Sequence, residues 1–110
     1  MGLFSFLFSN TSNAQNTATL LNSKDFKSAI EADKEAQVID VRTAMEFNRG
    51  HFESAVNISF FDRDFAVQME QFDKSKPIYL YCKSGNRSGK AARLLAKKGF
   101  EEIYDLKGGY

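Results

Sequence analysis

Short apolar runs recur along the chain, and more polar segments with helical spacing separate them. The runs are only a few residues long and are bounded by turn-forming residues, as is typical of strands. Runs that are apolar almost throughout are typical of strands buried on both faces of a sheet. The pattern predicts five strands, at 18–21, 37–41, 55–58, 78–81 and 103–106.

The segments between these runs predict helices. Apolar residues recur at helical spacing in 23–33, 43–48, 61–72 and 90–98. We expect Ser23 to cap the first helix, and Thr43 to form a capping box with Glu46 at the start of the second. The third carries an apolar stripe that we expect in the core, formed by Phe61, Phe65, Met69 and Phe72.

The alternation of strands and helices indicates the fold class. Short connections between apolar strands favour an α/β fold with a parallel sheet covered by helices on both faces. In open sheets of this kind, ligands bind beyond the carboxyl ends of the strands. We therefore search for chemistry in the segments that follow the strands.

Composition narrows the function classes. The chain has 110 residues, enough for one domain, and its net charge of +1 indicates neither nucleic acid nor an anionic membrane as a partner. One cysteine and one histidine exclude an internal disulfide and a cysteine-rich zinc site, and they fit a reducing, cytoplasmic location. We expect residues 1–19 to be a flexible leader whose apolar start is too short to span a membrane, with a secreted form left open, and 20–110 to be the domain.

The single cysteine, Cys82, stands where the predicted strand 78–81 gives way to a loop of small residues before the helix 90–98. Such loops can direct several backbone N–H groups to one point. A nearby helix N-terminus and the side chains of Lys83 and Arg87 favour ionisation of the thiol. This pattern predicts a nucleophile whose substrate or product is an anion.

The motifs around this position resemble those of the rhodanese family. A first signature comprises VIDVR at 38–42, EF at 46–47, GHF at 50–52 and AVNI at 55–58; the second, YLYCKSGNRS at 79–88, resembles the active-site loop. The resemblance extends over about 20–110 through YDL at 104–106 and KGGY at 107–110. Family members usually carry a further turn or more of helix, so we expect that the C-terminal helix is truncated after Tyr110.

The resemblance implies a single-domain thiosulfate:cyanide sulfurtransferase with a rhodanese-like, five-stranded parallel sheet. Cys82 would attack thiosulfate, release sulfite and carry a persulfide that passes to cyanide, a thiol or a partner protein. No metal or organic cofactor, nucleic acid or membrane enters this scheme. The substrate-binding residues implied are Lys83, Ser84, Gly85, Asn86, Arg87 and Ser88, with Arg42 at the border of the pocket.

Loop length separates this hypothesis from phosphatases on the same fold. A phosphatase loop places five residues between the cysteine and an arginine that clamps the phosphoryl oxygens, whereas four lie between Cys82 and Arg87. The shorter loop makes a smaller cradle, suited to a single sulfur atom, and Ser88 cannot replace the arginine fork. A sulfur-relay module that acts with a partner protein, and an arsenate reductase or phosphatase, stay open as alternatives.

Two polar residues near the predicted site have expected structural roles. Asp40 follows a buried strand, and we expect it to hold the neighbouring loop. We expect His51 to lie in a turn, because a thiol with a lowered pKa needs no separate base.

Overall fold

The computed structural model describes residues 18–110, which form a five-stranded parallel sheet with helices on both faces. The strands are β1 (Thr19–Leu21), β2 (Gln37–Asp40), β3 (Val56–Asn57), β4 (Ile78–Tyr81) and β5 (Ile103–Leu106). They lie in the order β1-β5-β4-β2-β3, and every neighbouring pair is parallel. The predicted α/β class and all five predicted strands are confirmed.

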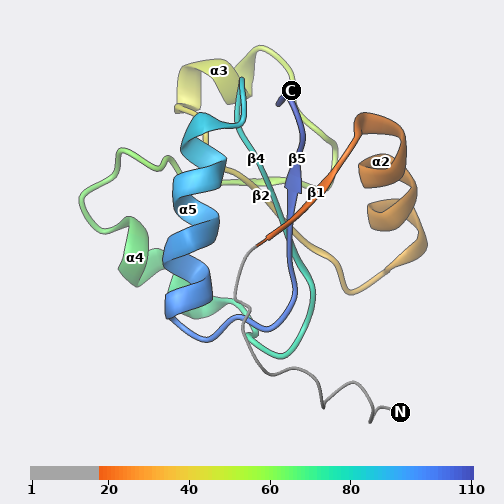
Figure 1. Ribbon diagram of the computed structural model, residues 1–110. Helices are drawn as coiled ribbons and strands as arrows, with labels where there is room; N and C mark the ends of the chain where they lie inside the picture. Colours follow the sequence, from red (N-terminus) through yellow and green to blue (C-terminus); the bar gives the residue numbers. More distant parts are fainter. Residues whose placement is uncertain (1–17) are drawn as a thin grey trace, which may run out of the picture.

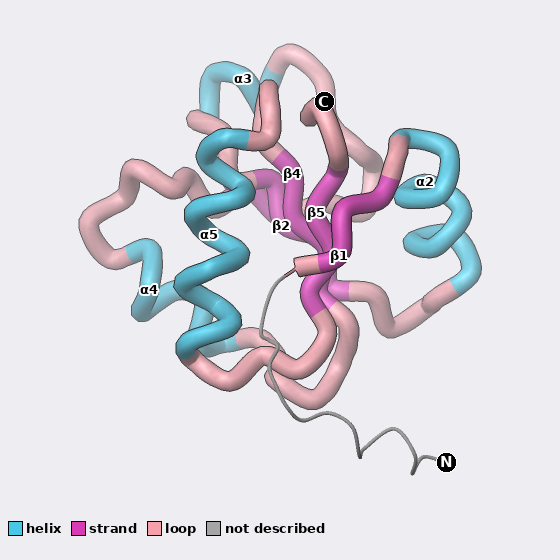
Figure 2. The backbone as a smooth tube through the Cα atoms, in the orientation of Figure 1, coloured by secondary structure: helices cyan, strands magenta, loops and turns pink. Residues whose placement is uncertain are grey.

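Helices cover the sheet from both sides, as Figure 2 shows. Helix α2 (Ser23–Ala32) packs on one face, while α5 (Asn86–Lys97) and α4 (Phe65–Gln68) lie on the other (Figure 1). The short helix α3 (Ala44–Asn48) follows β2, and a 3-10 helix, η2 (Met69–Gln71), continues α4. Within the described residues, no helix is both long enough and apolar enough to cross a membrane.

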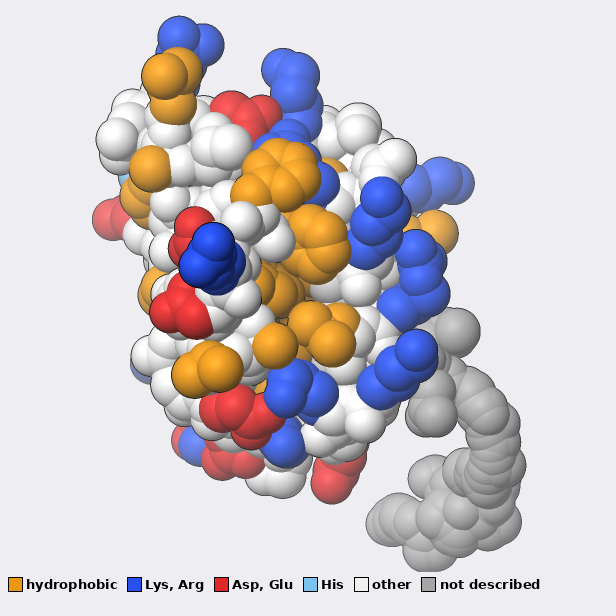
Figure 3. All heavy atoms as spheres, turned by 90° about the vertical axis from the view of Figure 1, so that its left-hand side faces the viewer, with side chains coloured by type: hydrophobic (Ala, Val, Ile, Leu, Met, Phe, Trp, Pro, Cys, Tyr) orange, Lys and Arg blue, Asp and Glu red, His pale blue; other side chains and the backbone are white. Residues whose placement is uncertain are grey.

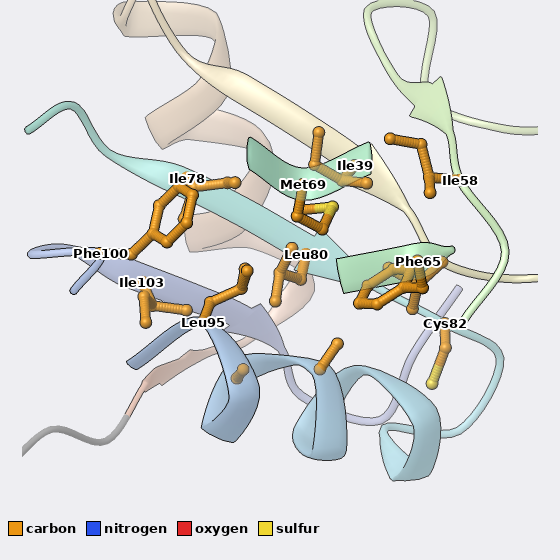
Figure 4. Close-up of a cluster of buried hydrophobic side chains, with 13 residues drawn as sticks. Ile39, Ile58, Phe65, Met69, Ile78, Leu80, Cys82, Leu95, Phe100 and Ile103 are labelled. Atoms are coloured by element: carbon orange, nitrogen blue, oxygen red, sulfur yellow. The ribbon is translucent and has the colours of Figure 1, made fainter. Parts of the chain in front are cut away.

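Alternating side chains of the central strand build both halves of the core. Ile78 and Leu80 of β4 face α5 and share one buried cluster with Cys82 and Leu95 (Figure 4). Tyr79 and Tyr81 point to the opposite face and pack with Phe26 of α2 in a second cluster. Because both faces are buried, the strand has no polar position, which explains its continuous apolar run.

Two details of the predicted helices are wrong at their starts. Asn22, rather than Ser23, caps α2, because its side chain accepts a hydrogen bond from the Asp25 amide at 2.8 Å. Helix α5 begins at Asn86, four residues before the predicted start at 90, so that Arg87 and Ser88 belong to its first turn. The turn into this helix is made by Gly85, whose φ of 95° is unfavourable for other residues.

The predicted helix at 61–72 is also wrong in extent. Turns occupy the segment before Phe65, where the α-helix begins, and the helix tightens into η2 at Met69. Phe65 and Met69 are buried as predicted, whereas Phe61 is 68 % exposed. The Ser59 hydroxyl accepts a hydrogen bond from the Phe61 amide, which favours a turn here over a helix.

Most of the predicted leader at 1–19 lies outside the described residues. Of its two described positions, Thr19 already belongs to β1 and pairs with Tyr104 of β5. The capping box predicted at α3 is confirmed, with the Thr43 hydroxyl accepting from the Glu46 amide and the Glu46 carboxylate accepting from the Thr43 amide.

Candidate active site

The sulfur of Cys82 lies at the carboxyl end of β4, directed at the first turn of α5 (Figure 4). The Gly85 amide donates to Sγ at 3.0 Å, and the Ser88 amide donates at 3.3 Å. The Ser88 hydroxyl is 3.4 Å from the same sulfur. Cys82 has no exposed surface.

Opposing effects set the pKa of this thiol. Burial, the largest single influence, disfavours the charged form and raises the pKa of Cys82. Hydrogen bonds from the Ser88 hydroxyl and from the amides of Ser88, Ser84 and Gly85 act in the other direction. Together they outweigh burial, and the net pKa of Cys82 lies below its ordinary value. The site therefore favours a thiolate, which is the nucleophilic form of cysteine.

A Ser88→Ala substitution removes the side-chain donor but keeps the backbone amide. We expect the pKa of Cys82 to rise by about one unit, since one hydrogen bond to a charged group contributes energy of that order. The measurement is the rate of alkylation by iodoacetamide as a function of pH. Ser84→Ala is the matched control, because Ser84 is exposed and offers its amide. Equal alkylation profiles for the two variants would contradict this account of the sulfur.

The other predicted residues of the loop differ in their surroundings: three have exposed side chains, and Arg87 is held in an ion pair. The side chains of Lys83, Ser84 and Asn86 are exposed at the rim. Arg87 makes a bidentate ion pair with Glu46 of α3, at 2.8 and 3.0 Å. The sequence pattern did not suggest this pairing, although the capping box marked Glu46 as an ordered residue.

This ion pair fixes the start of α5 against α3. The hydrogen bonds from Arg87, assisted by those from Thr43, lower the pKa of Glu46 to about 2, although partial burial acts in the opposite direction. The pKa of Arg87 is raised, first by its hydrogen bonds to Glu46 and to a smaller extent by charge at Cys82. One edge of the guanidinium is thus held by Glu46.

Arg42, unlike the half-buried Arg87, is a buried arginine at the same edge of the sheet. Its guanidinium pairs with Asp40, with Nη2 2.7 Å from Oδ2 and Nε 3.0 Å from Oδ1, and it donates to the Gly50 carbonyl at 2.7 Å. It also lies over the ring of Tyr110, 4.5 Å from the centroid. Arg42 borders a cavity of about 220 Å³ that Lys83 and Tyr110 also line, so this hollow adjoins the loop after Cys82.

An Asp40→Ala substitution leaves Arg42 buried without its counter-charge. Both side chains are at most 7 % exposed, and loss of one partner from such a pair costs about 3–5 kcal/mol. We expect urea unfolding to show a loss of this size. Glu35→Ala is the control, because Glu35 and Lys76 form an exposed ion pair, which contributes about 1 kcal/mol or less. Similar losses for the two variants would show that the Asp40–Arg42 pair does not support the fold.

His51 occupies a structural position, as expected. Its Nδ1 donates to the Phe47 carbonyl at 2.7 Å, and its ring stacks on Phe47 with the centroids 3.5 Å apart.

The segment 107–110 contributes contacts that sequence reasoning missed. The Tyr110 amide donates to the Cys82 carbonyl at 2.7 Å. Gly109, with φ 80°, lies so close to the loop that a Cβ there would be 2.1 Å from the Lys83 carbonyl oxygen. The consecutive glycines at 108 and 109 were the only sequence signal for this close approach.

The fold and the site together define a class of small α/β domains with a cysteine loop at the end of a central strand. The family described as "Rhodanese-like domain" matches residues 22–110. The chain therefore belongs to the rhodanese-like domain family, and the sequence-based recognition is confirmed.

Individual relatives support this membership. The chain is 44 % identical over 77 residues to the uncharacterized protein YqhL of Bacillus subtilis, matching 70 % of this chain and 60 % of that protein. It is 34 % identical to the thiosulfate sulfurtransferase GlpE of Shewanella oneidensis, over 70 % of this chain and 74 % of GlpE. It is also 41 % identical to a tRNA uridine(34) hydroxylase of Pelagibacter ubique, over 70 % of this chain but only 26 % of that protein.

A solved structure agrees with these relatives. The rhodanese-like domain protein of Staphylococcus aureus superposes with a TM-score of 0.73 at 25 % identity, covering 83 % of this chain and 86 % of that one. The matched part is 60 % of YqhL and about a quarter of the tRNA hydroxylase, so this chain spans only part of the length of these relatives.

Proposed function

We propose that this protein is a sulfurtransferase that carries sulfur as a persulfide on Cys82. The observation that carries the proposal is the convergence of two backbone donors on Sγ, the Gly85 amide at 3.0 Å and the Ser88 amide at 3.3 Å, with the Ser88 hydroxyl 3.4 Å from the same sulfur. The resemblance to the thiosulfate sulfurtransferase GlpE supports thiosulfate as a donor. We further propose that the reaction takes place in the cytoplasm, where a lone buried thiol stays reduced.

The proposed reaction has two displacement steps. The Cys82 thiolate attacks the outer sulfur of thiosulfate, and the sulfur–sulfur bond of the donor breaks as sulfite leaves with the electron pair. The product is a persulfide whose outer sulfur bears the negative charge. A nucleophilic acceptor, such as cyanide or a thiolate, then attacks that outer sulfur and restores the Cys82 thiolate.

The loop residues have separate parts in this proposal. Backbone N–H groups of the loop and the first turn of α5 stabilise the anion, since their donors already converge on Sγ. Lys83, at the rim, and Arg42, at the adjoining cavity, attract the anionic donor. Ser84 and Asn86 are exposed and border the entrance, while Arg87 orders the loop through Glu46.

Intact-mass spectrometry of the native protein tests the proposal. We expect incubation with millimolar thiosulfate to add the mass of one sulfur atom, and subsequent cyanide to remove it with release of thiocyanate. An unchanged mass, with a thiol that iodoacetamide shows to be free, would overturn the proposal. Release of phosphate from an aryl phosphate in a Cys82-dependent manner would instead favour the phosphatase alternative.

A second candidate is a sulfur relay in which a partner protein is the donor or acceptor. Full burial of Cys82 and the 68 % exposure of Phe61 favour it, because the Arg87 guanidinium lies 5.6 Å from the Phe61 ring and links this aromatic residue to the loop. Figure 3 shows hydrophobic side chains gathered beside a column of lysine and arginine on the side of the molecule where α4 and α5 lie. Persulfide formation with negligible turnover towards cyanide would favour the relay over the small-molecule enzyme.

A further inference from the structure

Asp105 is an unusual residue for the centre of a parallel sheet. It lies in β5 between Leu20 of β1 and Leu80 of β4, and only 3 % of it is exposed. Its Oδ1 atom has no hydrogen-bond partner within residues 18–110. An unpaired buried carboxylate is costly, and an aliphatic residue would suit the strand better. The position therefore requires an explanation beyond packing.

The carboxyl group of Asp105 faces the start of α5. A methyl group placed on Gly89 would be 4.0 Å from Asp105 Oδ2. Burial raises the pKa of this carboxyl group, and hydrogen bonding to the hydroxyl of Ser88, the residue before Gly89, partly offsets that effect. The same hydroxyl lies 3.4 Å from Cys82 Sγ. Ser88 therefore stands between two acidic groups and has one proton to donate.

The charged surroundings of Asp105 offer little compensation. Asp105 and Arg93 of α5 both line a cavity of about 330 Å³. No ion pair, however, joins Asp105 to a cation in the described part of the chain. Neither β1 nor the β4 residue paired with Asp105 brings a titratable side chain, since the neighbours there are Leu20 and Leu80. The acidic group that Ser88 contacts on its other side is Cys82. Two such groups that share a donor disfavour each other's ionised form.

We propose that Asp105 is a positioning residue for Cys82, whose carboxylate competes with the Cys82 sulfur for the hydroxyl proton of Ser88. The inference rests on the proposed persulfide chemistry. A thiolate places its charge on Sγ, whereas a persulfide places it on the outer sulfur, one atom away. When the charge moves outward, Ser88 is free to donate to Asp105. Asp105 thus favours the sulfur-loaded state over the resting thiolate.

The test compares Asp105→Asn with Glu101→Gln. Asparagine keeps the shape of the side chain and removes its charge; Glu101 is an exposed carboxylate just before the same strand and serves as the matched control. We expect the pH midpoint of iodoacetamide alkylation to fall in Asp105→Asn, with alkylation about 3- to 10-fold faster at neutral pH. A midpoint equal to that of Glu101→Gln, or a higher one, would overturn the proposal.

A second measurement addresses the loaded state. At a fixed ratio of thiosulfate to sulfite, we expect the ratio of persulfide to thiol to fall by about 3- to 10-fold in Asp105→Asn, as the preference for outward charge is lost. In the Ser88→Ala background the Asp105→Asn change should have no further effect. A full effect in that background would show that Ser88 is not the link.

A further variant separates loss of the fold from loss of the charge at Asp105. If Asp105→Asn does not fold, Asp105→Val is used in its place, because valine suits a buried strand, and it must shift the pH midpoint of alkylation in the same direction. The alkylation measurement requires no sulfur donor and therefore does not depend on sulfur transfer. A wild-type protein that takes up no sulfur would refute the proposed function but not the role of Asp105. A valine variant with an unaltered alkylation profile would refute the role of Asp105 alone.

Discussion

A Cys82→Ser protein takes up no sulfur from thiosulfate. Cys82 is the only cysteine in the chain, so no second thiol can replace it. A serine hydroxyl does not ionise near neutral pH, and the hydrogen bonds that favour a thiolate cannot make up this difference. Intact-mass spectrometry after incubation with thiosulfate is expected to show the mass of the unmodified variant.

The serine variant also needs a test of its fold, because Cys82 is fully buried in the cluster between β4 and α5. Serine is close to cysteine in size and finds donors in the Gly85 and Ser88 amides. We expect a cooperative thermal transition for the variant, while Glu35→Ala, altered in an exposed ion pair, takes up one sulfur atom as the native protein does. Uptake of sulfur by a folded Cys82→Ser protein would refute Cys82 as the carrier.

A Gly109→Ala substitution disrupts the loop that holds the sulfur. The added Cβ would lie 2.1 Å from the Lys83 carbonyl oxygen, 2.2 Å from its carbon and 2.6 Å from the Ser84 amide nitrogen. These are backbone atoms, which cannot rotate away as a side chain can. We expect a loss of about 2–4 kcal/mol in the free energy of unfolding, from overpacking together with strain at positive φ. We also expect slower alkylation of Cys82.

Gly108→Ala separates these two causes. Gly108 has the same φ of 80° as Gly109, but nothing lies within 4 Å of the position that its Cβ would occupy. It therefore carries the backbone strain without the collision, at a cost of about 1 kcal/mol. Urea unfolding and the rate of iodoacetamide alkylation measure both variants. If Gly109→Ala matched Gly108→Ala in both measurements, the contact with Lys83 would be of no consequence.

The sequence alone predicted the sheet and the location of the site because both depend on local patterns. The run at 78–81 has to be buried on both faces, and a parallel strand has to end at the ligand-binding edge. The capping box of Thr43 and Glu46 was predicted for the same reason, since all of its hydrogen bonds lie within four residues. Such features need no knowledge of the tertiary structure.

Other features depend on contacts between distant segments, which one sequence does not reveal. Glu46 and Arg87 are 41 positions apart, and Asp105 lies near the first turns of α5 only because the fold brings β5 there. The helix predicted at 61–72 was too long, because the spacing of its apolar residues indicates a helix even where Ser59 and the polar residues after Phe61 favour turns. The start of α5 was placed too late because glycine, asparagine and serine are common both in loops and in first turns.

The pairing of Glu46 with Arg87 has a consequence for acid resistance. The Glu46 carboxylate, with its pKa lowered to about 2, contributes stability that is fully present above its unfolded pKa and is lost progressively as pH falls from that value through 2. Mild acidification therefore leaves the ion pair between α3 and α5 in place, and the first turn of α5 keeps its position beside Cys82.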